Sequence, residues 1–397
     1  MRKPLMRIPY TDVLAPPIVV PASAASLPGA LAALARFLAA PSPRGLPPSA
    51  VVLSGAGLSV ASGLADYRGV KGTYRVNKSY RPIYYAEFLD SHEARKRYWA
   101  RSFLGWPSLH KASPNAGHYA LGDIGDLGLI RSVITQNVDS LHPKAHPRIP
   151  SLELHGYLRS TVCTSCRGEY SRDQFQDRLA QLNPRWAQLL QQALASGALD
   201  TEDPAQRRLR GLKSNPDGDV DLPEAPYTTF RYPPCPRCLT NPPPRPDGQP
   251  HTVQVDSDGA WASPSTAGIL KPAVVMFGES IAAPVKMAAE EAIDGAGKLL
   301  VLGTSLATYS AWRLAKRAKD RGMPMAIVNL GGVRGEDSFF TELSPGQSGE
   351  QAVRVEFATD QLLPALVSEL GKGATTATGD RSDTEASREN ALKDMLS

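Results

Sequence analysis

A glycine turn after the apolar run at residues 50–53 could hold a phosphate group. It is Gly55-Ala56-Gly57, and Ser59 follows two residues later. Glycines at such a turn let backbone N–H groups approach a diphosphate closely at a helix start, and the serine can add a hydroxyl. The fingerprint of Rossmann oxidoreductases would need glycine where Val60 stands, and no acid ends a second strand about 20 residues on to bind a ribose. The turn alone is a weak sign of a phosphate site, and it disfavours a conventional oxidoreductase.

A second polar cluster follows the apolar run at residues 130–135. Its side chains Gln136, Asn137 and Asp139 could bind ribose hydroxyls and an amide, although such a run alone is more often a turn. His155 lies downstream, and its imidazole, with an ordinary pKa of ~6.5, suits a general base near neutral pH. A histidine taken at random is more often structural than catalytic. His155 therefore stays a candidate that depends on a nucleotide site beside it.

All four cysteines of the chain fall in two Cys-x-x-Cys pairs, Cys163/Cys166 and Cys235/Cys238. Paired thiolates at this spacing suit tetrahedral zinc, and a disulfide scaffold would be unusual in a long chain with so few cysteines. Four thiolates leave no open position on the metal, so we expect a structural zinc ion and a reducing compartment. The long segment between the two pairs predicts an insertion within this zinc module.

Composition excludes some classes of function. The chain has 397 residues, 42% of them apolar, which is enough for a large α/β domain and a small module. Its 44 basic and 39 acidic residues give a net charge of only +5, which does not argue for a nucleic-acid partner. No apolar run reaches the length of about 18 residues that a membrane span needs. Residues 1–49 hold five basic residues and one acid, as mitochondrial transit peptides do, although a plain flexible leader fits equally well.

The elements that must position these groups alternate as in a doubly wound α/β fold. Four short apolar runs end in glycine, serine, asparagine or glutamine, which is typical of buried parallel strands with a ligand site at their carboxyl edge. Helices alternate with them, the first of them capped by Ser26. The expected strands are 50–53, 130–135, 298–302 and 325–328, and the expected helices are 27–38, 171–196, 288–296 and 311–321.

These patterns predict a Rossmann-like parallel sheet with helices on both faces, plus a small zinc-binding module. Residues 233–246 are rich in proline and residues 247–268 are rich in glycine, serine and aspartate, so both are predicted to be loop insertions. The expected organisation is a flexible leader over 1–24, the Rossmann-like domain over 25–160 and 270–368, the zinc module over 161–269, and a disordered tail over 369–397.

Five segments, in order along the chain, resemble the motifs of the sirtuin family. Any one of them could be chance, but five in order together with the cysteine pairs could hardly be. They span about residues 26–366 with the flanking helices. The matching segments are Gly55–Arg68 (GAG-x-S-x-x-SG-x-x-D-[FY]-R), Thr135–His142 (TQN-[IV]-D-x-LH), Leu154–Gly156 (the HG pair), Lys271–Glu279 ([KR]P-x-VV-x-FGE) and Gly303–Leu306 (G-[TS]-S-L).

The class II, mitochondrial-type lineage of that family is the most similar. Asp66–Arg68, Gly105–Pro107, Leu182–Trp186 and Pro216–Val220 resemble its segments, and it too carries a long stretch between its cysteine pairs. Two features depart from the family pattern. Ala65 stands where proline is usual, and a proline-rich insert over 239–268 follows Cys238, where the family has only a few residues. The insert puts substrate-side contacts in doubt and leaves the NAD site largely unaffected.

The resemblance implies removal of acyl groups from protein lysine side chains with NAD as co-substrate. It implies His155, Asn137 and Asp139 as catalytic residues and a structural zinc ion on the four cysteines. It implies substrate contacts at Val275, Phe277, Gly278 and Glu279, the last two pairing as a strand with the substrate backbone. It implies NAD contacts at Gly55, Ala56, Gly57, Ser59, Asp66, Tyr67, Arg68, Gln136, Asn137, Asp139, Gly303, Thr304, Ser305, Asn329, Leu330 and Gly331.

Two other functions remain open at this point. The same fold could serve a protein mono-ADP-ribosyltransferase or a lipoamidase, and the chain could be a catalytically silent zinc and NAD interaction module. The resemblance favours the mitochondrial matrix, with the cytoplasm or nucleus as alternatives. No membrane partner and no specific nucleic acid is expected.

Overall fold

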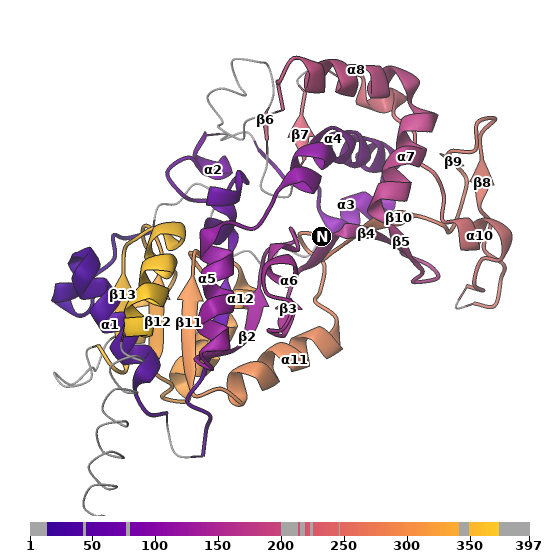
Figure 1. The fold of residues 1–397 in the computed structure, drawn as a ribbon. Coiled ribbons are helices and arrows are strands. Elements are labelled where there is room, and N and C mark those ends of the chain that lie inside the picture. The colour runs from indigo at the N-terminus through magenta and orange to yellow at the C-terminus, as the bar shows by residue number, and fades with distance from the viewer. Residues whose placement is uncertain are drawn as a thin grey trace, which may run out of the picture.

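The computed structural model describes residues 14–42, 45–76, 80–199, 213–214, 219–222, 225–245, 247–340 and 349–372. They form a larger lobe built on a parallel sheet and a smaller lobe that contains all four cysteines (Figure 1). Residues 1–13 of the expected leader and the expected tail after residue 372 lie outside the described part of the chain.

The larger lobe contains a six-stranded sheet in the order β13-β12-β11-β1-β2-β3, and every neighbouring pair is parallel. The four predicted runs form its four central strands, because strands covered on both faces are rich in apolar side chains. The sequence does not predict the two edge strands, which are short and, in β13, contain an arginine. The bounds are β1 (Ala50–Ser54), β2 (Ile130–Thr135), β3 (Ser151–Glu153), β11 (Lys298–Leu302), β12 (Met325–Val328) and β13 (Ala352–Val355).

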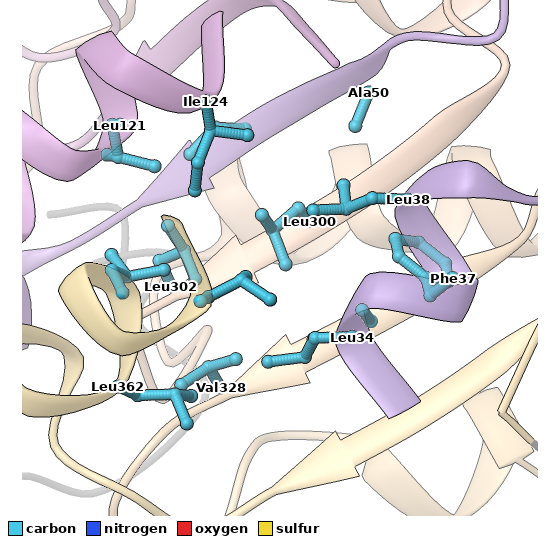
Figure 2. Packing of buried hydrophobic residues seen from close by; sticks show 14 of the residues in the cluster. Leu34, Phe37, Leu38, Ala50, Leu121, Ile124, Leu300, Leu302, Val328 and Leu362 are labelled. Atoms are coloured by element: carbon cyan, nitrogen blue, oxygen red, sulfur yellow. The ribbon is translucent and has the colours of Figure 1, made fainter. Parts of the chain in front are cut away.

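Helices cover both faces of this sheet, as predicted. Alternate strand residues point to opposite faces and build two separate cores. One core packs against α1 (Leu27–Ala39), α5 (Ala116–Asp126) and a helix over 359–372 (Figure 2). The other packs against α11 (Ala283–Asp294) and α12 (Tyr309–Asp320). The sheet is therefore buried between two helical layers, which fixes the positions of the loops at its carboxyl edge.

The chain reverses its winding direction at the middle of the sheet. From β1 it proceeds to β2 and β3 on one side, and it later returns to β11, β12 and β13 on the other. The chain therefore leaves the adjacent strands β1 and β11 toward strands on opposite sides of this point. In open α/β sheets such a switch point opens the crevice in which ligands bind.

The smaller lobe is built around an antiparallel sheet in the order β10-β4-β5. Its core holds Trp99, Phe175, Trp186, Phe230 and the cysteines. Its main elements are α3 (Tyr85–Asp90), α4 (His92–Lys111), β4 (Gly156–Cys163), β5 (Glu169–Ser171), α7 (Arg172–Leu182), α8 (Pro184–Ala195) and β10 (Leu270–Val274). Its shorter elements are β6 (Lys213–Ser214), β7 (Val220–Asp221), η3 (Tyr227–Thr229), α10 (Pro236–Thr240), β8 (Gln254–Val255) and β9 (Trp261–Ala262).

The helix expected over 171–196 is in fact two helices. It breaks at Asn183, because Pro184 disfavours helical geometry in the residue before it and can itself start a new helix. The Asn183 amide donates to the carbonyls of Leu179 and Arg231 at 2.8 and 2.7 Å, which fixes the corner. The expected insert over 239–268 is not wholly irregular, since it contains the hairpin β8–β9.

The remaining short elements connect the two lobes or the sheet edges. They are η1 (Ala22–Ala25), η2 (Ala56–Ser62), α2 (Thr73–Val76), α6 (Leu141–Ala145) and α13 (Glu336–Phe340). The folded part starts before residue 25, because Val20 pairs with Arg354 in the edge strand. Within the described residues, no helix is both long and apolar enough to cross a bilayer.

Candidate functional site

The glycine loops after β1 and β11 lie against each other at the switch point of the sheet. The Gly57 N–H donates to the Gly303 carbonyl at 2.8 Å. A Cβ atom on Gly57 would lie 2.8 Å from that oxygen, and one on Gly303 would lie 2.4 Å from the Leu58 nitrogen. Gly303 also has φ +57°, which glycine adopts without strain. Both positions therefore need glycine. The contact places the two glycine loops side by side, and together they form a surface that we call the glycine floor.

The polar turn after β2 is tied to this floor by side-chain hydrogen bonds. The Asn137 amide donates to the Gly55 carbonyl at 3.1 Å and to Ser59 Oγ at 3.0 Å. Ser59 in turn donates to Asp139 Oδ2 at 2.7 Å. Burial raises the pKa of Asp139, and the hydrogen bonds from Ser59 and the Leu141 N–H oppose that rise. The amide, hydroxyl and carboxyl are thus held in one chain of hydrogen bonds.

Gln136 is fixed by the loop that follows β11. Its Nε2 donates to the Ser54 carbonyl at 3.1 Å and to Thr304 Oγ1 at 2.9 Å, while its Oε1 accepts from Thr308 at 3.0 Å. All the amide groups of this side chain are therefore used inside the protein. The Gln136 side chain therefore holds the turn in place. The backbone carbonyl of Gln136 remains free of these contacts and faces His155.

That carbonyl orients His155. His155 Nδ1 lies 3.1 Å from the Gln136 oxygen, and its Nε2 lies 2.8 Å from Ser310 Oγ. A carbonyl can only accept, so Nδ1 carries the proton and the Nε2 lone pair faces Ser310. Burial lowers the pKa of His155 to about 4, and the hydrogen bond to Gln136 opposes that shift. The imidazole is therefore neutral near pH 7, with Nε2 available as a base.

These groups line one cleft of about 2670 Å³, larger than the 300–1,000 Å³ that drug-sized ligands fill. The cleft has room for an extended dinucleotide and a peptide side chain together. It contains every nucleotide, catalytic and substrate residue expected from the sequence: Gly55, Ala56, Gly57, Ser59, Asp66, Tyr67, Arg68, Gln136, Asn137, Asp139, His155, Val275, Phe277, Gly278, Glu279, Gly303, Thr304, Ser305, Asn329, Leu330 and Gly331.

The segment Val275–Glu279 is held between the two lobes. The Val275 N–H donates to the His155 carbonyl at 2.7 Å, which ties the segment to the loop that carries His155. The Glu279 carboxylate accepts the Met276 N–H at 2.9 Å and lies 3.1 Å from Lys271 Nζ. Burial lowers the pKa of Lys271, and Glu279 opposes that shift. The Glu279 side chain thus joins the Met276 backbone to Lys271 and stabilises this turn.

The loop after η2 adds aromatic and charged groups to the cleft. The Asp66 carboxylate accepts the Gly69 N–H at 3.1 Å, and burial raises its pKa. The guanidinium of Arg68 lies 5.0 Å from the centroid of the Tyr74 ring, and Tyr74 contacts Tyr67. Tyr67 and Arg68 therefore stand on one aromatic cluster at the cleft wall, and Asp66 closes the turn beside it.

The four cysteines meet in the smaller lobe, away from the cleft. All four Sγ atoms lie within 4.8 Å of one another, and the pairs Cys163/Cys238 and Cys166/Cys235 are 3.6 Å apart. Four sulfurs at 2.3 Å from a tetrahedral zinc would be about 3.8 Å apart, so the donor set fits zinc. The metal would join the end of β4 to the start of α10, which lie far apart in the sequence.

Sequence reasoning missed two residues of the site. Thr308 holds Gln136, and Ser310 contacts the base nitrogen of His155. Both are polar residues at the start of a predicted helix that follows a predicted ligand loop. That position is the signal that could have identified them.

Comparison with known proteins agrees with this geometry. The model of the Sir2 family matches residues 55–310. The NAD-dependent protein deacylase SIR4 of Batrachochytrium dendrobatidis is 39% identical over 306 residues, 75% of this chain and 86% of that protein. The NAD-dependent protein lipoamidase sirtuin-4, mitochondrial, of Bos taurus is 33% identical over 287 residues, 72% of this chain and 75% of that protein.

A solved structure described as "Structural Basis for the Mechanism and Regulation of Sir2 Enzymes" has the same fold. Its TM-score is 0.52 at 23% identity, and the match covers 86% of this chain and 98% of that one. The chain belongs to the Sir2 family, the sirtuins.

Proposed function

We propose that this protein removes acyl groups from lysine side chains of proteins and consumes NAD in doing so. The observation that carries the proposal is the state of His155. Its imidazole is neutral, its tautomer is set by the Gln136 carbonyl, and it shares one cleft with the Asn137–Ser59–Asp139 chain. The relatives named above carry the names of NAD-dependent enzymes that act on proteins.

In this proposal NAD lies extended along the carboxyl edge of the sheet. The backbone of Gly55–Gly57 holds the diphosphate, and Asn137 and Asp139 position the nicotinamide ribose and carboxamide. The adenosine half extends toward the ends of β11 and β12, where Gly303 and Asn329 lie. Fixing the nicotinamide and the acyl-lysine in one orientation supplies most of the rate, because the positioned reactants no longer lose their freedom of motion at the transition state.

The reaction then proceeds in three stages. The carbonyl oxygen of the acyl-lysine attacks C1′ of the ribose, the glycosidic bond breaks, and nicotinamide leaves with the bonding electron pair. His155 Nε2 next takes the proton of a ribose hydroxyl, whose oxygen attacks the carbon of the acyl group. Water finally releases free lysine and O-acyl-ADP-ribose. Ser310 must turn its hydroxyl away from Nε2 for the second stage to occur, because neutral imidazole has one lone pair there.

Zinc takes no part in these steps. Cys163, Cys166, Cys235 and Cys238 would fill all four positions of the metal and leave none for substrate or water. When bound, the ion supplies a covalent-like cross-link between distant segments of the smaller lobe.

Purified protein should be tested with NAD and a panel of peptides that differ only in the acyl group on one lysine, including acetyl, longer fatty acyl and lipoyl groups. The proposal expects nicotinamide and O-acyl-ADP-ribose to form in equal amounts with at least one peptide. Transfer of ADP-ribose to protein without loss of an acyl group would favour a transferase instead. If NAD is bound but not consumed with any peptide, the proposed enzyme activity is wrong.

We also propose that the protein works in the mitochondrion. The Bos taurus relative is named as mitochondrial, and residues 1–13, which precede the strand pairing of Val20, hold three basic residues and one acid. Fractionation of cells that express the chain with a C-terminal tag checks this, and recovery in the cytosolic or nuclear fraction would contradict it.

A further inference from the structure

Residues 14–21, the N-terminal strap, run along the outer edge of the sheet before the first helix begins. The Val20 N–H donates to the Arg354 carbonyl at 3.1 Å, and the Arg354 N–H donates back to the Val20 carbonyl at 2.6 Å. Val19 packs against the core beneath α1. The strap is thus anchored to the edge strand β13 by its last residues.

The first residues of the strap cover the loop that follows β12. A Cβ atom on Gly332 would lie 2.0 Å from the Ala15 carbonyl oxygen and 3.0 Å from Leu14 Cβ, and the closest atoms it would meet all belong to the strap. A residue with a side chain at position 332 would therefore push the strap away.

Arg354 joins the strap and this loop into one unit. Its side chain is fully buried, and its guanidinium donates to the Asn329 carbonyl at 2.9 Å and the Gly331 carbonyl at 2.7 Å. It also pairs with Glu336, which accepts the Val333 N–H at 2.9 Å. The backbone of Arg354 bonds to the strap while its side chain sets the loop, so the two cannot shift independently.

This unit faces the cleft at the end remote from His155. Leu14, Pro16 and Pro17 line the cleft together with Asn329–Gly332. In the sheet order β12 lies three strands from β2, which at roughly 4.8 Å per strand is about 14 Å. That distance suits the two halves of one dinucleotide. Leu330 in this loop is 59% exposed, so the cleft end presents unfilled apolar surface.

We propose that the N-terminal strap is a wall of the adenosine subsite and that Leu14, Pro16 and Pro17 cover one face of the adenine ring of NAD. The flat, apolar ring matches a leucine and two prolines, which offer apolar surface and, in the prolines, no N–H donor. The proposal rests on NAD as the co-substrate but not on the deacylation step.

Calorimetry with ADP-ribose tests the strap separately from catalysis, because ADP-ribose lacks nicotinamide and needs no acyl substrate. A variant that lacks residues 1–18 keeps Val19 and Val20 and so keeps the anchor. Its Kd for ADP-ribose should rise about tenfold, which corresponds to roughly 1.4 kcal/mol. A variant that lacks only residues 1–11 is the control and should bind as the full chain does. The KM for the acyl peptide should not change in either.

A second variant tests the same contact with the strap still present. Gly332→Ala in the full chain should weaken ADP-ribose binding, since the new methyl group displaces Ala15. The same substitution in the chain without residues 1–18 should have no further effect, because its clash partner is gone; such non-additivity marks two groups that act through one contact. Equal ADP-ribose affinity of the full and shortened chains, or additive effects of the two changes, would overturn the proposal. A full-length chain that binds ADP-ribose but turns over no acyl peptide would instead count against the proposed function and leave the strap proposal standing.

Discussion

At the scale of single residues, the site depends on keeping imidazoles uncharged. Burial lowers the pKa of His118 and of His155 to about 4 and also lowers those of His142 and His146. His142 Nε2 lies 2.7 Å from Ser54 Oγ at the end of β1, and His142 Nδ1 lies 2.9 Å from His146 Nε2. The buried rings contact the end of β1 through Ser54, so their protonation would disturb the glycine loop that follows β1.

We predict a loss of stability on mild acidification. The unfolded chain binds protons at these histidines below about pH 6.5, whereas folded His118 and His155 bind them only near pH 4. Between about pH 6.5 and 4 the unfolded state therefore binds more protons than the folded state. The free energy of unfolding keeps its full value above pH 6.5 and falls as the pH drops toward 4. For His118 alone the shift corresponds to about 3 kcal/mol. Denaturant unfolding between pH 7.5 and 5 measures the slope.

A matched variant isolates His118. Its Nδ1 accepts the Asn115 N–H at 3.3 Å as part of a capping box, a position that glutamine also fills. His118→Gln should keep the cap and flatten the pH dependence. His110→Ala, at an exposed histidine, should leave the slope as it is. If the free energy of unfolding depends on pH equally in wild type and His118→Gln, His118 is not a source of the acid sensitivity.

The sequence predicts motif residues that the structure brings into one cleft, but it does not predict the residues that support them. The motif residues lie close together in the sequence, so the chain itself shows that they belong together. They are Gln136, Asn137, Asp139 and His155. Ser310 lies 155 positions from its partner His155. The side chain of Arg354 reaches Asn329 only at its backbone carbonyl. A local position can mark Ser310 as a candidate, but which residue it contacts depends on which strands become neighbours, and no local pattern encodes that.

At the scale of elements, apolar runs that end in polar residues gave the four central strands. Boundaries of helices were less accurate: α11 begins at Ala283 and α12 at Tyr309, earlier than their apolar periodicity indicates. The first residues of these helices, Ala283 and Tyr309, are exposed. The start of α12 instead contacts the site through Thr308 and Ser310, and a hydrophobic period does not reveal such contacts.

Removal of zinc should destabilise the smaller lobe. The cysteines come from the end of β4, the turn after it and the start of α10, and the metal would cross-link them. We expect one zinc per chain by elemental analysis and a fall in Tm of more than about 5 °C after chelation. Cys235→Ser should lose the metal and show a similar fall. An unchanged Tm in metal-free protein would show that the four cysteines do not serve as a structural site.

The buried pair Lys271–Glu279 should affect the acyl substrate more than NAD. Lys271→Met removes the cation, leaves the carboxylate without it and loosens the turn Val275–Glu279. We expect the KM for the acyl peptide to rise about tenfold, with little change in ADP-ribose affinity. Lys316→Met, in an exposed pair with Asp320, is the control and should change neither. A larger effect on ADP-ribose than on peptide would contradict this assignment.

At the scale of the whole molecule, two lobes with separate cores enclose one cleft. The parallel sheet supplies the glycine floor and the polar turn, and the smaller lobe supplies the segment Val275–Glu279 through β10. Composition and cysteine spacing predict two lobes, and the order of the motifs predicts that they cooperate. The path of the N-terminal strap across the sheet edge could not be predicted, because its anchor is a single backbone pairing with a strand more than 300 residues away.

The most direct test of the whole account is His155→Ala, compared with the control His110→Ala. The account predicts that ADP-ribose binding by calorimetry stays within about twofold of wild type, since the floor and the strap are untouched. It predicts that formation of O-acyl-ADP-ribose falls by at least about 100-fold, the usual loss for removal of a general base. If His155→Ala forms that product at the rate of wild type, a neutral imidazole beside the nucleotide sugar is not the base of this enzyme.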